Sequence, residues 1–398
     1  MSVSDEPDRG VERPEILAVS SFPVLPVADG ATLRVAEILK GISPRWKIRL
    51  VAPAPRAGGL EYSSLGVVST TPVKLKGRWT FLPHQYTIGP LVDAVKSEIA
   101  SRRPTALLLW PGTEFLATEI DGIPPVVIDR IDCMTLLEWR RLTQTSIGRE
   151  SLSALSHLWI FYGYERRMAK ESAAVMVVGE ADAKLMRRMS GAKNIHVVPN
   201  GVQLGDEPDP ARRAAQPVVI FTGVMSYPPN IDAAAYFAKS IWPRVRDAVP
   251  DAVFRIVGRS PTPEVLALGK LERVEVVGEV DDLRDELESA WAAVAPMRVG
   301  VGIKNKVLEA WAAGAPVVMT SLATNGLYAR DRFTELVRDR PDAFADRVKR
   351  LLTDEGYRRF WSEQARDAAR VQSWSSVALS LIHISEPTRL LVQSRFPS

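Results

Sequence analysis

The stretch that decides the fold runs from Val294 to Thr320 and reads VAPMRVGVGIKNKVLEAWAAGAPVVMT. An apolar run is followed by a glycine-containing loop, a helical pattern, a Gly-Ala-Pro turn and a second apolar run. This order predicts strand, loop, helix and parallel strand, which is the repeating unit of an α/β domain. Because glycine lets the backbone approach a ligand closely, Gly300 and Gly302 also predict a binding loop at this point.

The start of the predicted helix carries the chemistry of the unit. We place it near Lys304 or Asn305, where the first unpaired N–H groups and the helix dipole favour an anion such as a diphosphate. Lys306 lies in this first turn, where a cation opposes the dipole, and a bound diphosphate would explain its presence. Glu309 follows three residues later on the same helix face, and its carboxylate can accept hydrogen bonds from two ribose hydroxyls.

Short apolar runs of the same kind extend over the rest of the chain, separated by helical patterns such as 32–40 and 88–102. Strands that alternate with helices predict parallel sheets covered on both faces. The polar, proline-containing stretch 204–216 resembles a linker between two such domains. The predicted strands are 15–21, 48–52, 106–110, 125–128, 175–179 and 195–199, then PVVIFTG, VFRIVG, VEVVG, WAAVAPM and PVVMT.

The composition excludes several other classes of protein. Hydrophobic residues make up 46% and charged residues 25% of the 398 residues, which is typical of globular domains. The 51 cations and 47 anions show no long basic run, so we expect no nucleic-acid partner. A single cysteine, Cys133, and four scattered histidines predict neither an intramolecular disulfide nor a metal site. The polar, acidic start lacks the features of a signal peptide, and no apolar run reaches roughly 18 residues, so we expect a cytoplasmic protein.

Four motifs follow one another along the chain: VVPNGV (197–202), FTGVMSYPPNIDA (221–233), IVGRSP (256–261) and GIKNKVLEAWAAGAPVV (302–318). In this order they resemble the "glycosyl transferases group 1" family of retaining GT-B enzymes, and in particular a bacterial subgroup tied to exopolysaccharide assembly. The resemblance covers roughly residues 15–375. It implies two Rossmann-like, doubly wound domains facing a cleft: 1–203 for the acceptor and, after the linker 204–216, 217–379 for the nucleotide sugar.

The resemblance also implies a role for individual residues. Glu309 should hold the ribose of the donor and Lys306 its diphosphate, while Gly302 and Ile303 should offer backbone N–H groups. Glu279 and Val280 should border the base, and the loop at Asp29-Gly30 should approach the sugar from the first domain. No cofactor is expected, because the nucleoside-diphosphate sugar is the donor substrate, and no metal is expected if cationic side chains and the helix dipole carry the phosphate charge.

Two departures from the family pattern bear on the donor site. The family commonly has two glutamates eight positions apart, and the earlier position here is Val301. Many members also place Arg and Lys just after the first strand of the second domain, where this chain has Val224 and the turn 227–230. Neutralisation of the diphosphate must then depend on Lys306, with Lys304, Arg298 or Arg259 as further candidates.

Other segments leave alternatives open. Asp132, in VVIDRIDCM, is the candidate for a catalytic or acceptor contact, and a helix-cap or turn role is the alternative. His157 lies in LSALSHLWIFYGYERR, which we interpret as a packed helix, although with Arg166 and Arg167 it could instead touch a membrane surface peripherally. The tail 380–398 contains SLIHISEPTR, which resembles a translated sequencing adapter, so we assign it no function.

The sequence thus predicts a glycosyltransferase of the hexosyltransferase type that moves a sugar from a nucleoside-diphosphate sugar to a saccharide or lipid-linked hydroxyl in polysaccharide synthesis. Two alternatives keep the same fold. A nucleotide-sugar 2-epimerase would need acid and base groups around the sugar, and none is identified in the sequence. A catalytically inactive sugar-nucleotide binding module is favoured by Val301 and by the missing Arg and Lys.

Overall fold

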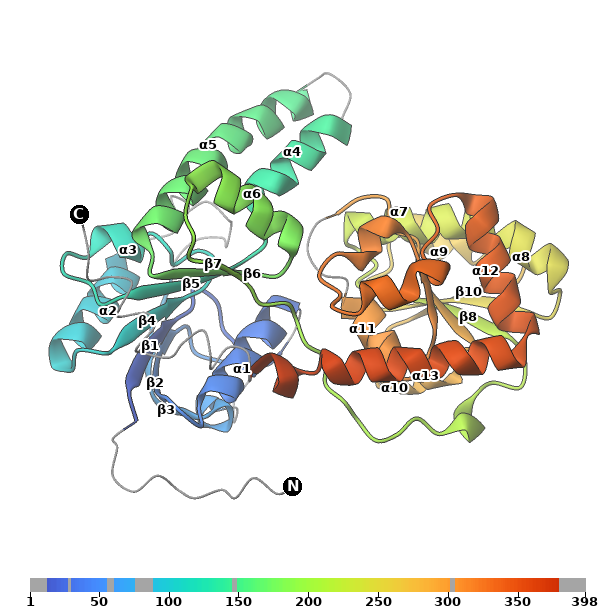
Figure 1. The fold of residues 1–398 in the computed structure, drawn as a ribbon, viewed down its shortest axis with the longest axis horizontal. Coiled ribbons are helices and arrows are strands. Elements are labelled where there is room, and N and C mark those ends of the chain that lie inside the picture. Colours follow the sequence, from blue (N-terminus) through green and yellow to red (C-terminus); the bar gives the residue numbers. More distant parts are fainter. Residues whose placement is uncertain are drawn as a thin grey trace.

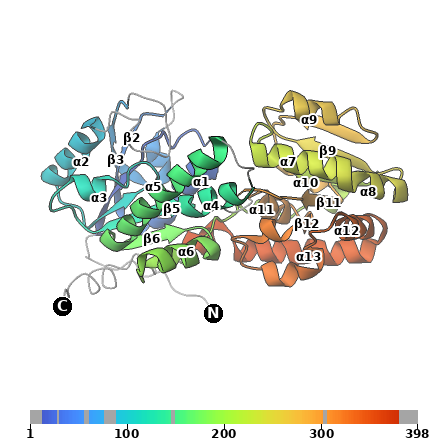
Figure 2. The ribbon, with the colours of Figure 1, turned by 90° about the horizontal axis from the view of Figure 1, so that it is seen from above.

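Two α/β domains lie side by side in the computed structural model (Figures 1 and 2). The structure describes residues 13–27, 30–55, 61–75, 89–144, 149–300 and 305–378. Within these ranges no helix is both long enough and apolar enough to cross a bilayer. The doubly wound, two-domain architecture predicted from the sequence is confirmed.

The first domain is built on a parallel sheet with seven strands among the described residues, in the order β3-β2-β1-β4-β5-β6-β7. Because side chains alternate along a strand, β1 sends Ile16 and Ala18 into the core beneath helix α1, and Leu17 and Val19 into the core beneath α2. Both faces are therefore covered, which explains the continuous apolar runs. The strands are Glu15–Val19, Lys47–Ala52, Val67–Pro72, Ala106–Leu109, Val126–Ile131, Ala174–Val177 and Ile195–Val197 (β1–β7).

The helices of this domain alternate with its strands. They are α1 Gly30–Ile42, α2 Gly89–Ser101, α3 Leu116–Glu119, α4 Met134–Gln144, α5 Arg149–Glu171 and α6 Glu180–Ser190, with a 3₁₀ turn at Tyr62–Leu65. Helices α4 and α5 form a hairpin that projects beyond the sheet (Figure 1). Helices α1 and α4 lie toward the second domain (Figure 2).

The second domain has a parallel sheet of five described strands in the order β10-β9-β8-β11-β12. Its core contains an aromatic cluster in which Phe237 packs on Phe254 with ring centres 4.5 Å apart. The strands are Val218–Thr222, Val253–Val257, Val274–Gly278, Ala292–Ala295 and Val317–Met319 (β8–β12). The helices are α7 Pro228–Tyr236, α8 Trp242–Ala248, α9 Pro263–Leu268, α10 Leu283–Ser289, α11 Asn305–Ala312, α12 Pro341–Thr353 and α13 Glu355–Val371, with a π-helical turn at Phe237–Ile241 and 3₁₀ turns at Pro210–Arg212, Ser321–Thr324 and Arg330–Leu336.

The chain passes between the domains twice. It leaves the first domain after β7, and after α13 it returns, where the N–H of Trp374 donates to the carbonyl of Val202 at 3.1 Å. Trp374 and Val377 are then buried in the core of the first domain beside α1. The last described turn, within the predicted second domain, therefore packs on the first (Figure 1).

Candidate active site between the domains

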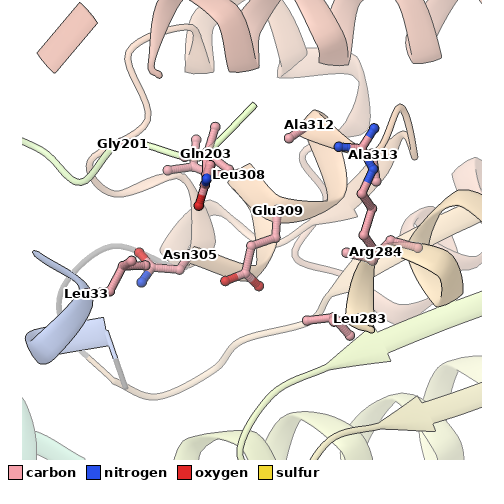
Figure 3. A pocket seen from close by; sticks show the side chains of 12 residues that line it. Leu33, Gly201, Gln203, Leu283, Arg284, Asn305, Leu308, Glu309, Ala312 and Ala313 are labelled. Carbon is pink, nitrogen blue, oxygen red and sulfur yellow. The ribbon is translucent and has the colours of Figure 1, made fainter. Parts of the chain in front are cut away.

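A cavity of about 390 Å³ lies between the two domains. It is lined by the start of α1, by the loops that follow β8, β9 and β10, and by α11. A second cavity of about 260 Å³ adjoins it, and the two share Leu33, Leu283, Asn305 and Glu309 (Figure 3). The carboxyl ends of parallel strands meet at this cleft, which is where α/β domains bind ligands.

Two glycines form the wall of the cavity at the ends of β8 and β9. Gly223 has φ 153° and Gly258 has φ 146°, a region that L side chains rarely adopt. The N–H of Gly223 donates to the carbonyl of Val257 at 3.1 Å, and a Cβ on Gly258 would lie only 1.8 Å from the carbonyl oxygen of Gly223. Glycine is required here because the two strand ends approach each other with backbone against backbone.

We expect Gly258→Ala to destabilise the second domain by about 1–3 kcal/mol, because the new Cβ meets a backbone oxygen that cannot move aside. Urea unfolding of the variant measures the loss. Gly269→Ala is the matched control, since its Cβ would find ordinary contacts of 3.4 Å or more. Equal free energies of unfolding for the two variants would contradict the close backbone approach.

Two helix N-termini face each other across the cavity. Helix α1 starts at Gly30 and helix α11 starts at Asn305, and a Cβ on Gly30 would lie 3.0 Å from Nδ2 of Asn305. The start of a helix presents N–H groups without partners inside the helix, and the positive end of a dipole. Two such starts, one from each domain, make this part of the cleft suited to a doubly charged anion such as a diphosphate.

The ammonium of Lys306 is held beside these helix starts. Its Nζ donates to Oδ1 of Asn230 at 2.7 Å and lies 4.1 Å from the ring centre of Phe221. Asn230 is fixed in turn, because its Nδ2 donates to the carbonyl of Val224 at 2.9 Å. The turn 227–230, which occupies the place of Arg and Lys in the family pattern that the sequence resembles, therefore supplies an amide that positions the lysine. Sequence reasoning missed this role of Asn230.

Glu309 points into the cavity from the next turn of α11, between Asn305 and Leu283 (Figure 3). Within the described residues, no hydrogen bond or ion pair is formed to its carboxylate. Burial raises the pKa of Glu309 above its ordinary value, and the charge of Lys306 opposes this only in part. A partly buried carboxylate that lines a cavity between two domains is suited to accept hydrogen bonds from a ligand.

A buried polar chain connects the first domain to the start of α11. The guanidinium of Arg34 in α1 pairs with Asp129 at 2.8 Å, and its Nη1 donates to Oδ1 of Asn200 at 2.9 Å. Nδ2 of Asn200 then donates to Oδ1 of Asn305 at 2.9 Å. Arg34 and Asp129 are fully buried, and Trp110 donates to the same carboxylate. This series of buried polar contacts fixes the starts of α1 and α11 relative to each other.

Asp132 lies on the first-domain wall of the cleft but does not line the cavity. Its charge raises the pKa of Tyr227, a residue of the opposite domain whose pKa is raised mainly by burial. Ile131, which precedes it, has φ 64°. The fully buried Glu165 anchors the turn that follows, accepting from the N–H groups of Met134 and Thr135 at 2.8 and 3.1 Å.

Asp132 also belongs to a pair of carboxyl groups. Burial is the largest cause of the pKa of Asp182 rising to about 6, and Asp132 adds to it, while the N–H of Cys133 and the charge of Arg140 oppose the rise. Arg140 reaches across the cleft to the carbonyl of Gly300 at 3.4 Å. The catalytic or acceptor role of Asp132 stays a prediction.

The structure brings most of the predicted donor residues together. Gly30, Arg259, Glu279, Val280 and Glu309 line the same cavity, and Lys306 lies against it beside Gly223. Arg298 does not join them, because it pairs with Asp232 and stacks on Tyr236. Asp29, Val301, Gly302, Ile303 and Lys304 lie outside the described residues, as do residues 380–398.

Comparison with known proteins agrees with this geometry. Residues 216–354 match the family model "Glycosyl transferases group 1". Similar solved structures include HepE of Anabaena in complex with UDP and glucose (TM-score 0.64, 13% identity, 93% of this chain and 98% of that one) and a glycosyltransferase of Rickettsia africae (TM-score 0.68, 13% identity, 96% and 100%). WaaG, a glycosyltransferase involved in lipopolysaccharide biosynthesis, is also similar (TM-score 0.59, 13% identity, 93% and 99%). No curated protein sequence matches the chain. The GT-B fold is established by these likenesses, and the second domain carries the group 1 match.

Proposed function

We propose that the protein is a glycosyltransferase that moves a sugar from a nucleoside-diphosphate sugar to a hydroxyl of a saccharide or lipid-linked acceptor. One observation carries the proposal: a carboxylate without a hydrogen bond or ion pair among the described residues, a lysine ammonium and two helix N-termini converge on one cavity between the domains. These groups match a ribose and a diphosphate. The family match of the second domain and the complexes of HepE with UDP and with UDP-glucose support the same donor class.

The chemistry follows from how the cleft meets the diphosphate. As the bond between the anomeric carbon and the diphosphate oxygen breaks, negative charge grows on the leaving group beside Lys306 and the starts of α1 and α11. These fixed charges and dipoles stabilise that charge without rearrangement. The acceptor oxygen bonds to the anomeric carbon, and its proton passes to the leaving diphosphate. Retention of configuration is part of the proposal by family resemblance, as is a role in bacterial polysaccharide synthesis.

The function is tested by mixing the full chain with UDP-, GDP- and ADP-sugars. Thermal shift identifies the donor that binds, and chromatography of the products then follows that donor with and without saccharide acceptors. Transfer to an acceptor, or slow release of free sugar and nucleoside diphosphate, is the expected result. A donor epimer formed without acceptor would identify the epimerase alternative, and tight binding without any product would identify an inactive binding module.

We expect Lys306→Ala to lower the affinity for the nucleotide sugar about tenfold and to change the affinity for the bare nucleoside little. Of these two ligands, the nucleotide sugar is the one that presents a diphosphate to the ammonium. Calorimetric titration with both ligands measures the difference. Lys270→Ala, an exposed lysine after α9, is the matched control. Small and equal losses for both ligands would remove Lys306 from the diphosphate site.

A further inference from the structure

The outward side of helix α5 carries an unusual combination of side chains. Four apolar residues, Leu155, Trp159, Ile160 and Tyr162, are exposed there, and Trp159 keeps 69% of its surface accessible. They lie in the middle of α5, closer to the tip of the α4–α5 hairpin than the basic residues that follow them, and the hairpin projects from the first domain (Figure 1). We call this group the apolar zone of α5.

A basic zone follows on the same side of the helix. Arg166, Arg167 and Lys170 are exposed one to two turns after Tyr162. Arg166 follows Tyr162 by four residues, Arg167 follows Ile160 by seven and Lys170 follows Trp159 by eleven, spacings that place them on the same half of the helix. Glu171 is the exposed anion of this part of α5, and it pairs with Arg167 at 2.8 Å. The outward side is therefore apolar toward the tip and cationic toward the body of the domain.

The inward side of the same helix explains why these residues stay outside. Ala154, Phe161, Met168 and Ala169 are buried, and the carboxylate of Glu165 is paired with Arg130 in the interior at 3.1 Å. Helix α5 is thus fully anchored by one side, and the apolar zone cannot turn inward. Helix α5 is therefore packed on one side and exposes an apolar surface on the other, whereas packing and membrane contact were alternatives in the sequence analysis.

From this arrangement we infer that the outward side of α5 docks on an anionic phospholipid surface. Trp and Tyr suit the boundary between lipid and water, because their rings combine an apolar body with a polar atom. Arg166, Arg167 and Lys170 complement negatively charged headgroups beside that boundary. An anionic membrane uses both zones at once, because the apolar side chains enter the boundary region while the cations pair with headgroups.

The inferred docking surface belongs to the same hairpin as a residue of the cleft. Helix α4 pairs with α5 in the hairpin, and Arg140 of α4 reaches the carbonyl of Gly300, which precedes the donor loop. The hairpin therefore connects the docking surface to the wall of the cleft. The inference rests on the proposed function in one respect: a lipid-linked acceptor would explain why the protein docks on a membrane. The test of docking does not depend on catalysis.

The experiment is flotation of the full chain with vesicles of phosphatidylcholine alone and of phosphatidylcholine mixed with phosphatidylglycerol. We expect binding to the mixed vesicles that weakens as salt is raised. Trp159→Ser with Ile160→Ser should lower the partition coefficient at least tenfold. Arg166→Gln with Arg167→Gln should lower it about fivefold per charge on mixed vesicles only. Phe360→Ser and Arg359→Gln, exposed on α13, are matched controls and should change nothing.

Three results would overturn the inference: no flotation at low salt, equal binding by the α5 variants and the wild type, or self-association that Trp159→Ser abolishes, which would make a second copy the occupant. Calorimetric donor binding, measured on every variant, separates the two proposals. Donor affinity should stay at the wild-type level in the α5 variants. Vesicle binding without any donor binding would count against the proposed function while leaving the docking surface supported.

Discussion

Glu309→Gln is expected to lower the affinity for the nucleotide sugar roughly ten- to a hundredfold while leaving the protein folded. The carboxylate lines the cavity between the domains, and in the proposed site it accepts from both hydroxyls of a ribose, whereas an amide offers one acceptor and one donor. The loss corresponds to about 1.5–3 kcal/mol. Calorimetric titration of the wild type and the variant measures it, with Glu363→Gln on the surface of α13 as the matched control.

The 2′-deoxy donor makes the test specific to the ribose. If Glu309 grips the 2′-hydroxyl, the substitution should cost less with the deoxy donor, because one partner is already absent. An equal loss with both donors would contradict the assigned contact. Undiminished affinity for the natural donor would remove Glu309 from the site.

The raised pKa of Glu309 also predicts how Glu309→Gln changes stability: the variant should lose donor affinity without losing stability. The folded-state pKa is raised by burial, so the unfolded chain loses this proton at a lower pH than the folded protein. Ionisation of Glu309 therefore lowers the stability of the ligand-free fold as the pH rises from the ordinary glutamate pKa to the raised pKa. At neutral pH we expect Glu309→Gln to melt at the wild-type temperature or above it. A lower melting temperature would indicate a structural role instead.

Arg34→Leu is expected to destabilise the protein by about 3–5 kcal/mol. The substitution leaves the carboxylate of Asp129 fully buried, with the indole N–H of Trp110 as its remaining side-chain donor among the described residues. Breaking a buried ion pair from one side costs this much because the other charge is left uncompensated. The free energy of unfolding in urea measures the effect.

The double variant Arg34→Leu, Asp129→Leu supplies the control. Removing both charges removes the uncompensated carboxylate, so most of the loss should be recovered. Removing one partner of the exposed pair Arg359 and Glu363 should cost only about 0.3–0.5 kcal/mol. A double variant as unstable as Arg34→Leu alone would show that the arginine acts through packing and not through its charge. Donor affinity should also fall in Arg34→Leu, because Asn200 and Asn305 lose their anchor.

Much of the fold could be predicted from the sequence because buried parallel strands leave unbroken apolar runs. All strands of the second domain and six of the first coincide with such runs to within a few residues. The strand that sequence analysis missed, β3, is Val67–Pro72 at the edge of its sheet, where most of its side chains are exposed. An edge strand with VVSTTP has no apolar run to reveal it.

The donor site was predictable where one short segment holds several of its groups, as α11 does with Lys306 and Glu309. The partners of those groups were not, because they come from distant parts of the chain. An asparagine in a turn and an arginine in a helix are ordinarily solvated, so neither Asn230 nor Arg34 gives a signal by itself. Asn200 lies within the recognisable VVPNGV segment, and its place at the predicted domain junction was the signal that it could contact both domains.

The return of the chain to the first domain has a consequence for how the protein is made. During synthesis the first domain leaves the ribosome before Trp374 and Val377 exist, although both are part of its core. Domains generally fold as they emerge, beginning from the N-terminus. Here the first domain stays incomplete, with an apolar site beside α1 exposed, until the second domain has been translated and α13 carries the last turn back. Its final packing is therefore a late event that follows the synthesis of the second domain and depends on the folding of its neighbour.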